Sequence, residues 1–88
     1  MTDVIVWTKP ACGPCTAVKA ALTTANVPFI ERDITAPDAA EDLEYFRRLG
    51  LASAPITEYG ARAVPGFLPT EIGEVIDLWR SDHHVEQT

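Results

Sequence analysis

The chain has little positive charge and few cysteines. It contains 7 Lys and Arg against 13 Asp and Glu in 88 residues, which gives a formal net charge of −6. Nucleic-acid binding needs clustered Lys and Arg side chains that neutralise phosphates, so this balance argues against a nucleic-acid partner. The same negative charge disfavours binding to anionic membranes. Two cysteines are too few for a disulfide-rich secreted scaffold, which usually needs about four or more.

The sequence also lacks a targeting signal and a membrane span. No basic residue precedes the apolar run 4–7, which is too short for a signal peptide. No apolar run approaches the ~18 residues that a membrane span needs. We therefore expect a cytoplasmic protein in a reducing compartment. There, a closely spaced cysteine pair is more often catalytic or metal-binding than structural.

Helix and strand patterns alternate along one domain, which we assign to residues 1–80, with a flexible tail at 81–88. Strands are predicted at 4–7, 29–34, 56–59 and 62–64, and helices at 14–26, 35–50 and 69–80. The first two strands are joined by a helix, so they should be parallel with a right-handed crossover. The last two strands should form an antiparallel hairpin. The order β-α-β-α-β-β-α predicts an α/β fold, with a four-stranded mixed sheet and helices on both faces.

Capping residues set the predicted helix ends. Asn26 suits a left-handed position after the first helix, and Gly50 suits the same position after the second. Thr35 is the predicted N-cap of the second helix, with Pro37 in its first turn. The two tryptophans, Trp7 and Trp79, are predicted to lie in the core. Glu58 is a conflict, because a carboxylate falls within a strand predicted to be central.

The segment Cys12-Gly13-Pro14-Cys15 lies between the first predicted strand and the first predicted helix. A cysteine at a helix N-terminus faces unpaired backbone N–H groups and the positive end of the helix dipole. Both stabilise the thiolate, which predicts a lowered pKa for Cys12 and makes it the nucleophile. Cys15, one turn into the helix and more covered, would resolve the mixed disulfide that Cys12 forms with a substrate.

Two other interpretations of this region remain open. The cysteine pair could be half of a zinc site, but the further soft ligands, His83 and His84, are adjacent rather than spaced as zinc ligands usually are. Lys9, three residues before Cys12, could stabilise its thiolate, meet an acidic partner, or be a solvated surface lysine. Pro55 precedes a predicted strand, and an X-Pro bond is cis in only about 5–6% of cases.

With these motifs in place, the chain resembles the thioredoxin superfamily, and within it the glutaredoxin-like NrdH-redoxins. The resemblance covers about residues 3–80. It rests on Val6-Trp7-Thr8-Lys9-Pro10-Ala11-Cys12, similar to the family's V-Y-T-K-P-x-C, on Ser53-Ala54-Pro55, and on Gly66-Phe67-Leu68-Pro69. The resemblance implies a cis peptide bond before Pro55, which lies beside Cys12 and helps a partner's extended backbone to dock. The residues expected to contact substrate are Lys9, Gly13, Pro14, Ala54, Pro55, Gly66 and Phe67.

Three departures from the family pattern bear on partner choice. Cys12-Gly13-Pro14-Cys15 is the thioredoxin tetrapeptide, whereas NrdH-redoxins often carry C-V-Q-C. Ala11 stands where thioredoxins usually have tryptophan. The family's W-S-G-F segment reads Val64-Pro65-Gly66-Phe67, so its tryptophan is missing.

The resemblance implies a thiol-disulfide oxidoreductase with no bound cofactor and no metal. Proteins that resemble glutaredoxins carry a C-P-Y-C segment and a G-G-x-x-D segment that holds glutathione at the last helix. This chain has no Tyr between its cysteines and no Asp at the start of its last helix, where it has Thr70 and Glu71. We therefore expect a monomer that receives electrons from NADPH through thioredoxin reductase and reduces ribonucleotide reductase. The alternatives are a glutathione-dependent glutaredoxin and a thiol module that binds metal.

Overall fold

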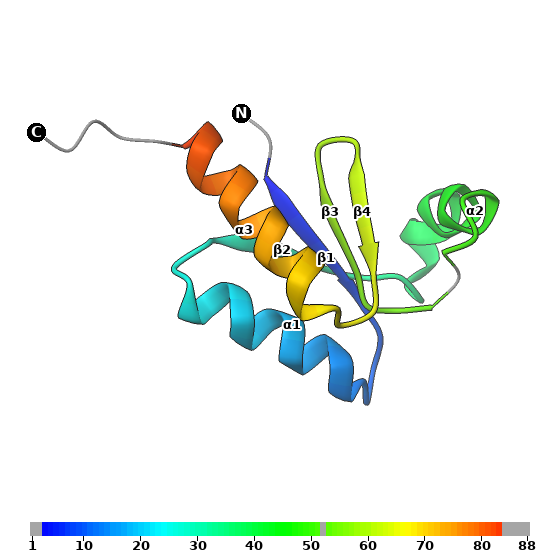
Figure 1. The fold of residues 1–88 in the computed structure, drawn as a ribbon. Helices are drawn as coiled ribbons and strands as arrows, with labels where there is room; N and C mark the ends of the chain where they lie inside the picture. Colours follow the sequence, from blue (N-terminus) through cyan, green and yellow to red (C-terminus); the bar gives the residue numbers. More distant parts are fainter. Residues whose placement is uncertain (1–2, 52, 84–88) are drawn as a thin grey trace, which may run out of the picture.

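The computed structural model describes residues 3–51 and 53–83 (Figure 1). Its elements, in chain order, are β1 (Val4–Thr8), α1 (Gly13–Thr24), β2 (Phe29–Asp33), a 3-10 turn η1 (Pro37–Ala39), α2 (Ala40–Arg48), β3 (Ile56–Tyr59), β4 (Arg62–Pro65) and α3 (Pro69–Asp82). No helix in these described ranges is long and apolar enough to cross a membrane.

The strands form one mixed sheet in the order β2-β1-β3-β4. β1 pairs in parallel with β2, so that Val6 lies opposite Glu31, and antiparallel with β3, where Val6 lies opposite Thr57. β3 and β4 form the antiparallel hairpin. The predicted α/β fold, a four-stranded mixed sheet with three helices, is confirmed, as are the pairing directions.

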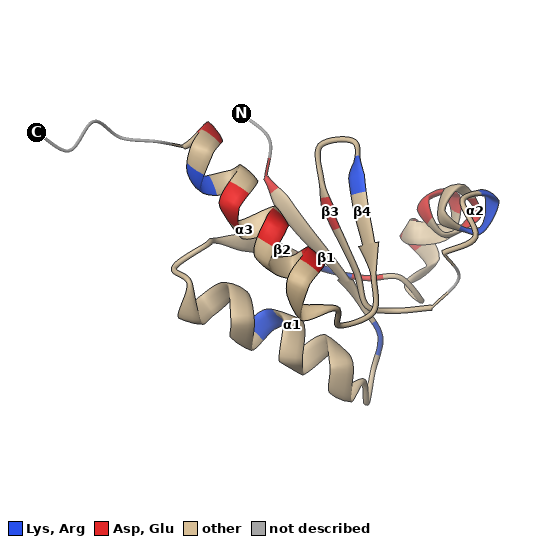
Figure 2. Ribbon diagram, viewed as in Figure 1, with Lys and Arg blue, Asp and Glu red and all other residues tan. Residues whose placement is uncertain are grey.

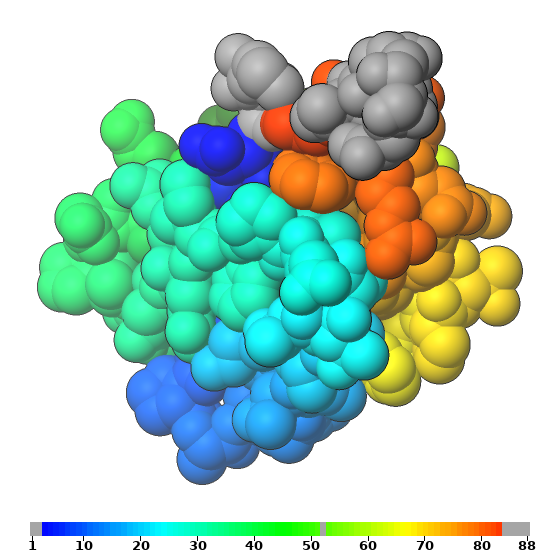
Figure 3. All heavy atoms as spheres, turned by 90° about the vertical axis from the view of Figure 1, so that its left-hand side faces the viewer, coloured from blue at the N-terminus to red at the C-terminus, as the bar shows by residue number. Residues whose placement is uncertain are grey.

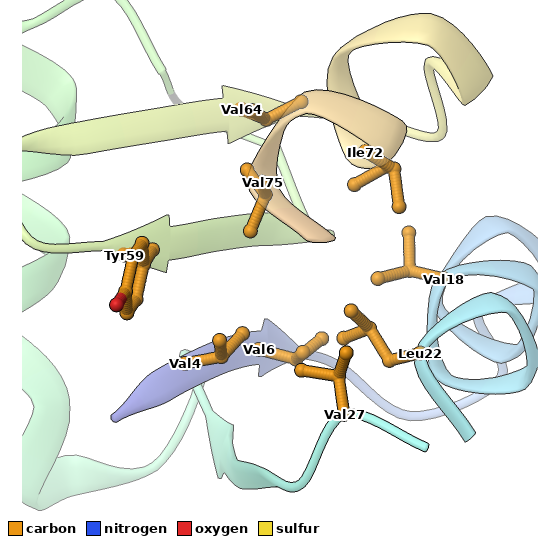
Figure 4. Packing of buried hydrophobic residues seen from close by; sticks show 9 residues of the cluster. All are labelled: Val4, Val6, Val18, Leu22, Val27, Tyr59, Val64, Ile72 and Val75. Carbon is orange, nitrogen blue, oxygen red and sulfur yellow. The ribbon is translucent and has the colours of Figure 1, made fainter. Parts of the chain in front are cut away.

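Helices α1 and α3 cover one face of the sheet. Val4 and Val6 of β1 point into this layer and are fully buried. Figure 4 shows side chains of α1, such as Leu22, and of α3, such as Val75, converging on them. The full cluster comprises Val4, Val6, Val18, Leu22, Val27, Tyr59, Val64, Ile72 and Val75. Trp79 is half-buried at its edge.

Helix α2 covers the opposite face. Trp7, the alternate residue of β1, packs edge-on against Phe46 of α2, with ring centroids 5.5 Å apart. The Trp7 indole Nε1 donates a hydrogen bond to Glu58 Oε1 at 3.1 Å, which explains how β3 accommodates a carboxylate. Burial on both faces explains why residues 4–7 are continuously apolar rather than alternating.

The left-handed backbone conformation predicted after each of the first two helices is confirmed, but the predicted N-cap of the second helix is wrong. Asn26 and Gly50 have φ values of 60° and 79°. Thr35, however, caps no helix, because its N–H and its hydroxyl both donate to Asp33 Oδ1, at 2.8 and 2.6 Å. These bonds also lower the pKa of Asp33. The helical segment therefore starts later, at η1, whose N-cap residue Ala36 has no side-chain acceptor.

The last helix ends two residues later than the predicted end at residue 80. Ser81 and Asp82 are the last residues of α3, and the N–H of His83 still bonds to the Trp79 carbonyl oxygen at 2.9 Å. The Tyr59 hydroxyl donates to Asp82 Oδ2 at 2.5 Å and ties this end of α3 to β3. The rest of the predicted tail, residues 84–88, lies outside the described residues.

The Tyr59–Asp82 contact predicts how stability depends on alkaline pH. The hydrogen bond to Asp82 raises the pKa of Tyr59 to about 12, compared with about 10 for an unperturbed tyrosine. The neutral phenol is therefore favoured by folding. Its contribution is complete below about pH 10 and is lost as the pH rises toward about 12.

Urea unfolding at a series of pH values across this window tests the prediction. Tyr59→Phe should lose less of its free energy of unfolding than wild type between about pH 10 and 12. Tyr45→Phe, a change at an exposed tyrosine of α2, is the matched control and should follow wild type. Parallel pH profiles for wild type and Tyr59→Phe would contradict the assignment.

Candidate active site

The cysteine pair lies at the start of α1. Cys12 is the N-cap residue, with extended backbone angles of φ −113° and ψ 106°. Its Sγ accepts a hydrogen bond from the Cys15 backbone N–H at 3.2 Å. Gly13 and Pro14 form the first turn, where the missing N–H of proline leaves no bond unmade. The sulfur of Cys12 therefore occupies the position in which an oxygen-bearing side chain usually caps a helix.

Cys12 and Cys15 form a disulfide, with their Cα atoms 5.3 Å apart. The two residues differ in exposure, because Cys12 is half-buried and Cys15 is only 2% exposed. An incoming molecule therefore has better access to Cys12. This difference agrees with the predicted roles of an attacking Cys12 and a resolving Cys15, which stay predictions.

Ala11, directly before the pair, has a backbone conformation that the sequence did not indicate. Its φ is 55°, in the left-handed region, which costs a residue with a Cβ roughly 1–2 kcal/mol. Ala11 is exposed, so its side chain gains little packing in return. The sharp turn at Ala11 directs the chain from the loop after β1 into the capping position of Cys12.

The Ala54–Pro55 bond is cis, as the family resemblance implied. Pro55 is fully buried, and its carbonyl oxygen accepts a hydrogen bond from Gly66 N at 2.7 Å. Gly66 has a φ of 69°, which favours glycine. The structure therefore brings together Ala54, Pro55 and Gly66, three residues predicted to contact substrate.

The sheet register places these residues and the cysteine loop at one end of the molecule. Trp7 of β1 lies opposite Ile56 of β3, which lies opposite Pro65 of β4. The loop after β1, the residues before β3 and the residues after β4 therefore leave the sheet at the same end, as Figure 1 shows. No described contact joins Pro55 or Phe67 to a cysteine, so direct contact between Pro55 and Cys12 stays a prediction.

Two predicted contact residues are exposed side chains. Phe67 is 38% exposed just before α3, beside Leu68 at 40%. Lys9 is exposed in the loop after β1, and no carboxylate among residues 3–51 and 53–83 forms an ion pair with it. Of its three predicted alternatives, an acidic partner within the described chain is absent. Stabilisation of the Cys12 thiolate by Lys9 stays a prediction.

The sequence around the pair carries only positive charge although the chain is acidic. Lys9 and Lys19 are the only charged residues between positions 4 and 30, but Lys19 forms an ion pair with Glu31 of β2 at 3.0 Å. Figure 2 shows acidic residues on α2 and α3 and also on the strands, so the positive charge that no described carboxylate pairs with is that of Lys9, in the loop before Cys12. Positive charge and helix N–H groups near a cysteine both favour its thiolate.

The described part of the chain offers the cysteine pair no further ligands with which to form a metal site. There, no group of three or more His, Cys, Asp or Glu side chains is placed to hold a metal ion. His83 stacks on Trp79 at the far end of α3, with ring centroids 4.3 Å apart. His84, the other ligand considered, lies outside the described residues.

Comparison with known proteins places the chain in a family. The family model described as Glutaredoxin matches residues 4–65, which include the cysteine pair and Pro55. The chain belongs to the glutaredoxin family. The Gene 56 protein of Mycobacterium phage L5 is 34% identical to this glutaredoxin-family protein over 77 residues, which cover 86% of this chain and 74% of the phage protein.

Solved structures show the same fold. The glutaredoxin-like protein NrdH-redoxin from Escherichia coli has a TM-score of 0.72 at 24% identity, covering 82% of this chain and 92% of that chain. A buckwheat glutaredoxin–glutathione complex has a TM-score of 0.75 at 14% identity, covering 97% and 83%. The predicted resemblance to glutaredoxin-like proteins of the thioredoxin superfamily is confirmed. The protein is a thiol-disulfide oxidoreductase of the redoxin type.

The left-handed conformation of Ala11 leads to a test by substitution. Because the Ala11 side chain is exposed, a change there acts through the backbone rather than through packing. Ala11→Val places a β-branched residue at positive φ and should lower the free energy of unfolding by about 1 kcal/mol or more. Ala11→Gly should not destabilise the protein, because glycine adopts this conformation freely. Urea unfolding of the oxidised proteins measures both, and equal stability of the two variants would contradict the backbone assignment.

Proposed function

We propose that this protein is a dithiol reductase of the NrdH-redoxin type, which reduces protein disulfides with the Cys12–Cys15 pair. The observation that carries the proposal is the position of Cys12 as N-cap of α1, with a more buried Cys15 hydrogen-bonded to its sulfur. One sulfur is accessible for attack and the other is held within bonding distance of it. The protein needs no bound cofactor or metal for this chemistry.

The proposed reaction proceeds in two exchange steps. The Cys12 thiolate attacks a disulfide in the substrate protein, forms a mixed disulfide and releases one substrate thiolate, which takes up a proton. The Cys15 thiol loses a proton and attacks Cys12 Sγ, which re-forms the Cys12–Cys15 disulfide and releases the second substrate thiol. The substrate gains two electrons and two protons. The redoxin supplies both electrons and the Cys15 proton, and the other proton comes from the solvent, which had taken it up when Cys12 ionised. The N–H of Cys15 and the start of α1 stabilise the anionic sulfur of Cys12.

A thioredoxin reductase using NADPH is the proposed electron donor. Support comes from the start of α3, where Thr70 and Glu71 follow Pro69 and the Asp of the glutathione-holding G-G-x-x-D segment is missing. A redoxin without that Asp is expected to hold glutathione weakly. Glutathione is an anion, so the net charge of −6 supports the same choice, although only weakly, because Lys9, which pairs with no described carboxylate, lies in the loop before Cys12.

A glutathione-dependent glutaredoxin is the second candidate. It is favoured by the match to the Glutaredoxin family model, which nevertheless ends at residue 65, before α3 begins. Ribonucleotide reductase is the proposed substrate, because its cysteine pair must be reduced again after each turnover. We also propose a cytoplasmic location and a monomer, since a carrier must present Cys12 to two different partners in turn.

The reductant is tested by NADPH oxidation with an insulin disulfide as the substrate. One reaction contains thioredoxin reductase, and a second contains glutathione with glutathione reductase. We expect turnover with thioredoxin reductase and little with glutathione. Turnover confined to the glutathione reaction would replace the proposed donor with the second candidate.

The roles of the two cysteines predict different defects. Cys12→Ser should abolish turnover, because it removes the accessible nucleophile. Cys15→Ser should instead accumulate a mixed disulfide between Cys12 and the substrate, because no thiol remains to resolve it. Non-reducing electrophoresis and intact mass measure that adduct. Retention of full dithiol activity by Cys15→Ser would show that the roles are assigned wrongly.

A further inference from the structure

Three elements meet at one carboxylate beside the active-site loop. Thr8 Oγ1 donates a hydrogen bond to Glu31 Oε2 at 3.1 Å, and Lys19 Nζ lies 3.0 Å from the same oxygen. Thr8 is the last residue of β1, Glu31 is the middle residue of β2, and Lys19 belongs to α1. We call these residues the Thr8–Glu31–Lys19 bridge. In Figure 3 the early part of α1, in blue, lies directly below the cyan and green segment that contains β2.

The bridge holds both ends of the loop that carries Cys12. Thr8 immediately precedes loop residues 9–12, and α1 immediately follows them. Lys19 comes four residues after Cys15, which places it on the same side of α1, one turn further along. The bridge therefore fixes the end of β1 relative to the turn of α1 that follows Cys15. The segment between these two points contains both cysteines, whose sulfur atoms must come together to form the disulfide.

The contacts of the bridge are specific for a charged carboxylate. The hydrogen bond from Lys19, assisted by that from Thr8, lowers the pKa of Glu31. Thr8 is only 6% exposed, and its hydroxyl is nearer to Glu31 than to the Arg32 carbonyl oxygen, which lies at 3.4 Å. The side chains of Lys19 and Glu31 are 32% and 45% exposed, so replacing either leaves the core intact.

We propose that Glu31 is a positioning residue for the Cys12–Cys15 pair. By holding Thr8 and Lys19, Glu31 favours the closed disulfide over the open dithiol. A disulfide requires its two backbones at a fixed short separation, whereas a dithiol tolerates a wider range. Restricting the loop therefore raises the effective concentration of one thiol toward the other. The inference rests on the proposed redox function of this pair.

The equilibrium between the two forms tests the inference. In dithiothreitol buffers, the Cys12–Cys15 disulfide takes two electrons and two protons from the dithiol reagent, which becomes the cyclic disulfide. Alkylation of free thiols followed by intact mass gives the ratio of the forms. Glu31→Gln should shift this equilibrium toward the dithiol by up to about fivefold, the effect of an exposed ion pair contributing at most about 1 kcal/mol. The reduction potential becomes less negative as a result.

Matched variants separate positioning from general effects. Glu44→Gln changes the net charge equally and breaks the exposed Arg48–Glu44 contact on α2, and should leave the equilibrium unchanged. Lys19→Met and Thr8→Val should shift it in the same direction as Glu31→Gln, whereas Thr8→Ser, which keeps the hydroxyl, should restore the wild-type value.

Two results would overturn the inference. In the first, Glu31→Gln lowers the melting temperature of the oxidised and reduced proteins equally and leaves their equilibrium unchanged. In the second, Glu44→Gln shifts the equilibrium as much as Glu31→Gln does. A different result, in which the wild-type pair fails to exchange with dithiothreitol at all, would instead overturn the proposed function on which the inference rests.

Discussion

The burial of β1 between two helical layers is the constraint on which the rest of the structure depends. Val4 and Val6 face α1 and α3, while Trp7 faces α2, so one strand of five residues organises both halves of the core. The strand ends at Thr8, and the cysteine loop starts at the next residue. The position of Cys12 is therefore set by the most deeply buried segment of the chain, although the site itself is open to partners.

The contrast between global and local charge changes how the composition should be interpreted. The overall charge of −6 is a property of the whole chain, and much of its acidity lies on α2 and α3. Partners approaching Cys12 meet Lys9 and the start of a helix, whereas the charge of Lys19 is balanced by Glu31. At short range Lys9 and the helix N–H groups matter more than distant carboxylates, which salt screens beyond about 8–10 Å. An acidic protein can in this way keep a site that stabilises an anionic sulfur.

Periodicity and capping residues were sufficient to predict the order of elements, the parallel pairing of the first two strands, the hairpin of the last two and the place of the cysteine pair. They were insufficient wherever a distant partner decides the local structure. Thr35 has the composition of a helix cap, but Asp33 takes its donors. α3 continues past residue 80, and its end is held by Tyr59, 23 residues earlier. The conformation of Ala11 and the convergence of Thr8 and Lys19 on Glu31 likewise depend on how β1, β2 and α1 are assembled.

The capping of α1 by a sulfur atom links the state of the helix to the catalytic cycle. Cys12 Sγ is both the acceptor for the Cys15 N–H and the atom that exchanges bonds. A thiolate accepts hydrogen bonds more strongly than a sulfur in a disulfide, because ionised groups form the stronger hydrogen bonds. The first turn of α1 is therefore expected to be held most firmly when the protein is reduced and ready to attack. The bond to the disulfide sulfur, which the structure shows, is the weaker of the two, so each turnover should change how firmly the start of the helix is held.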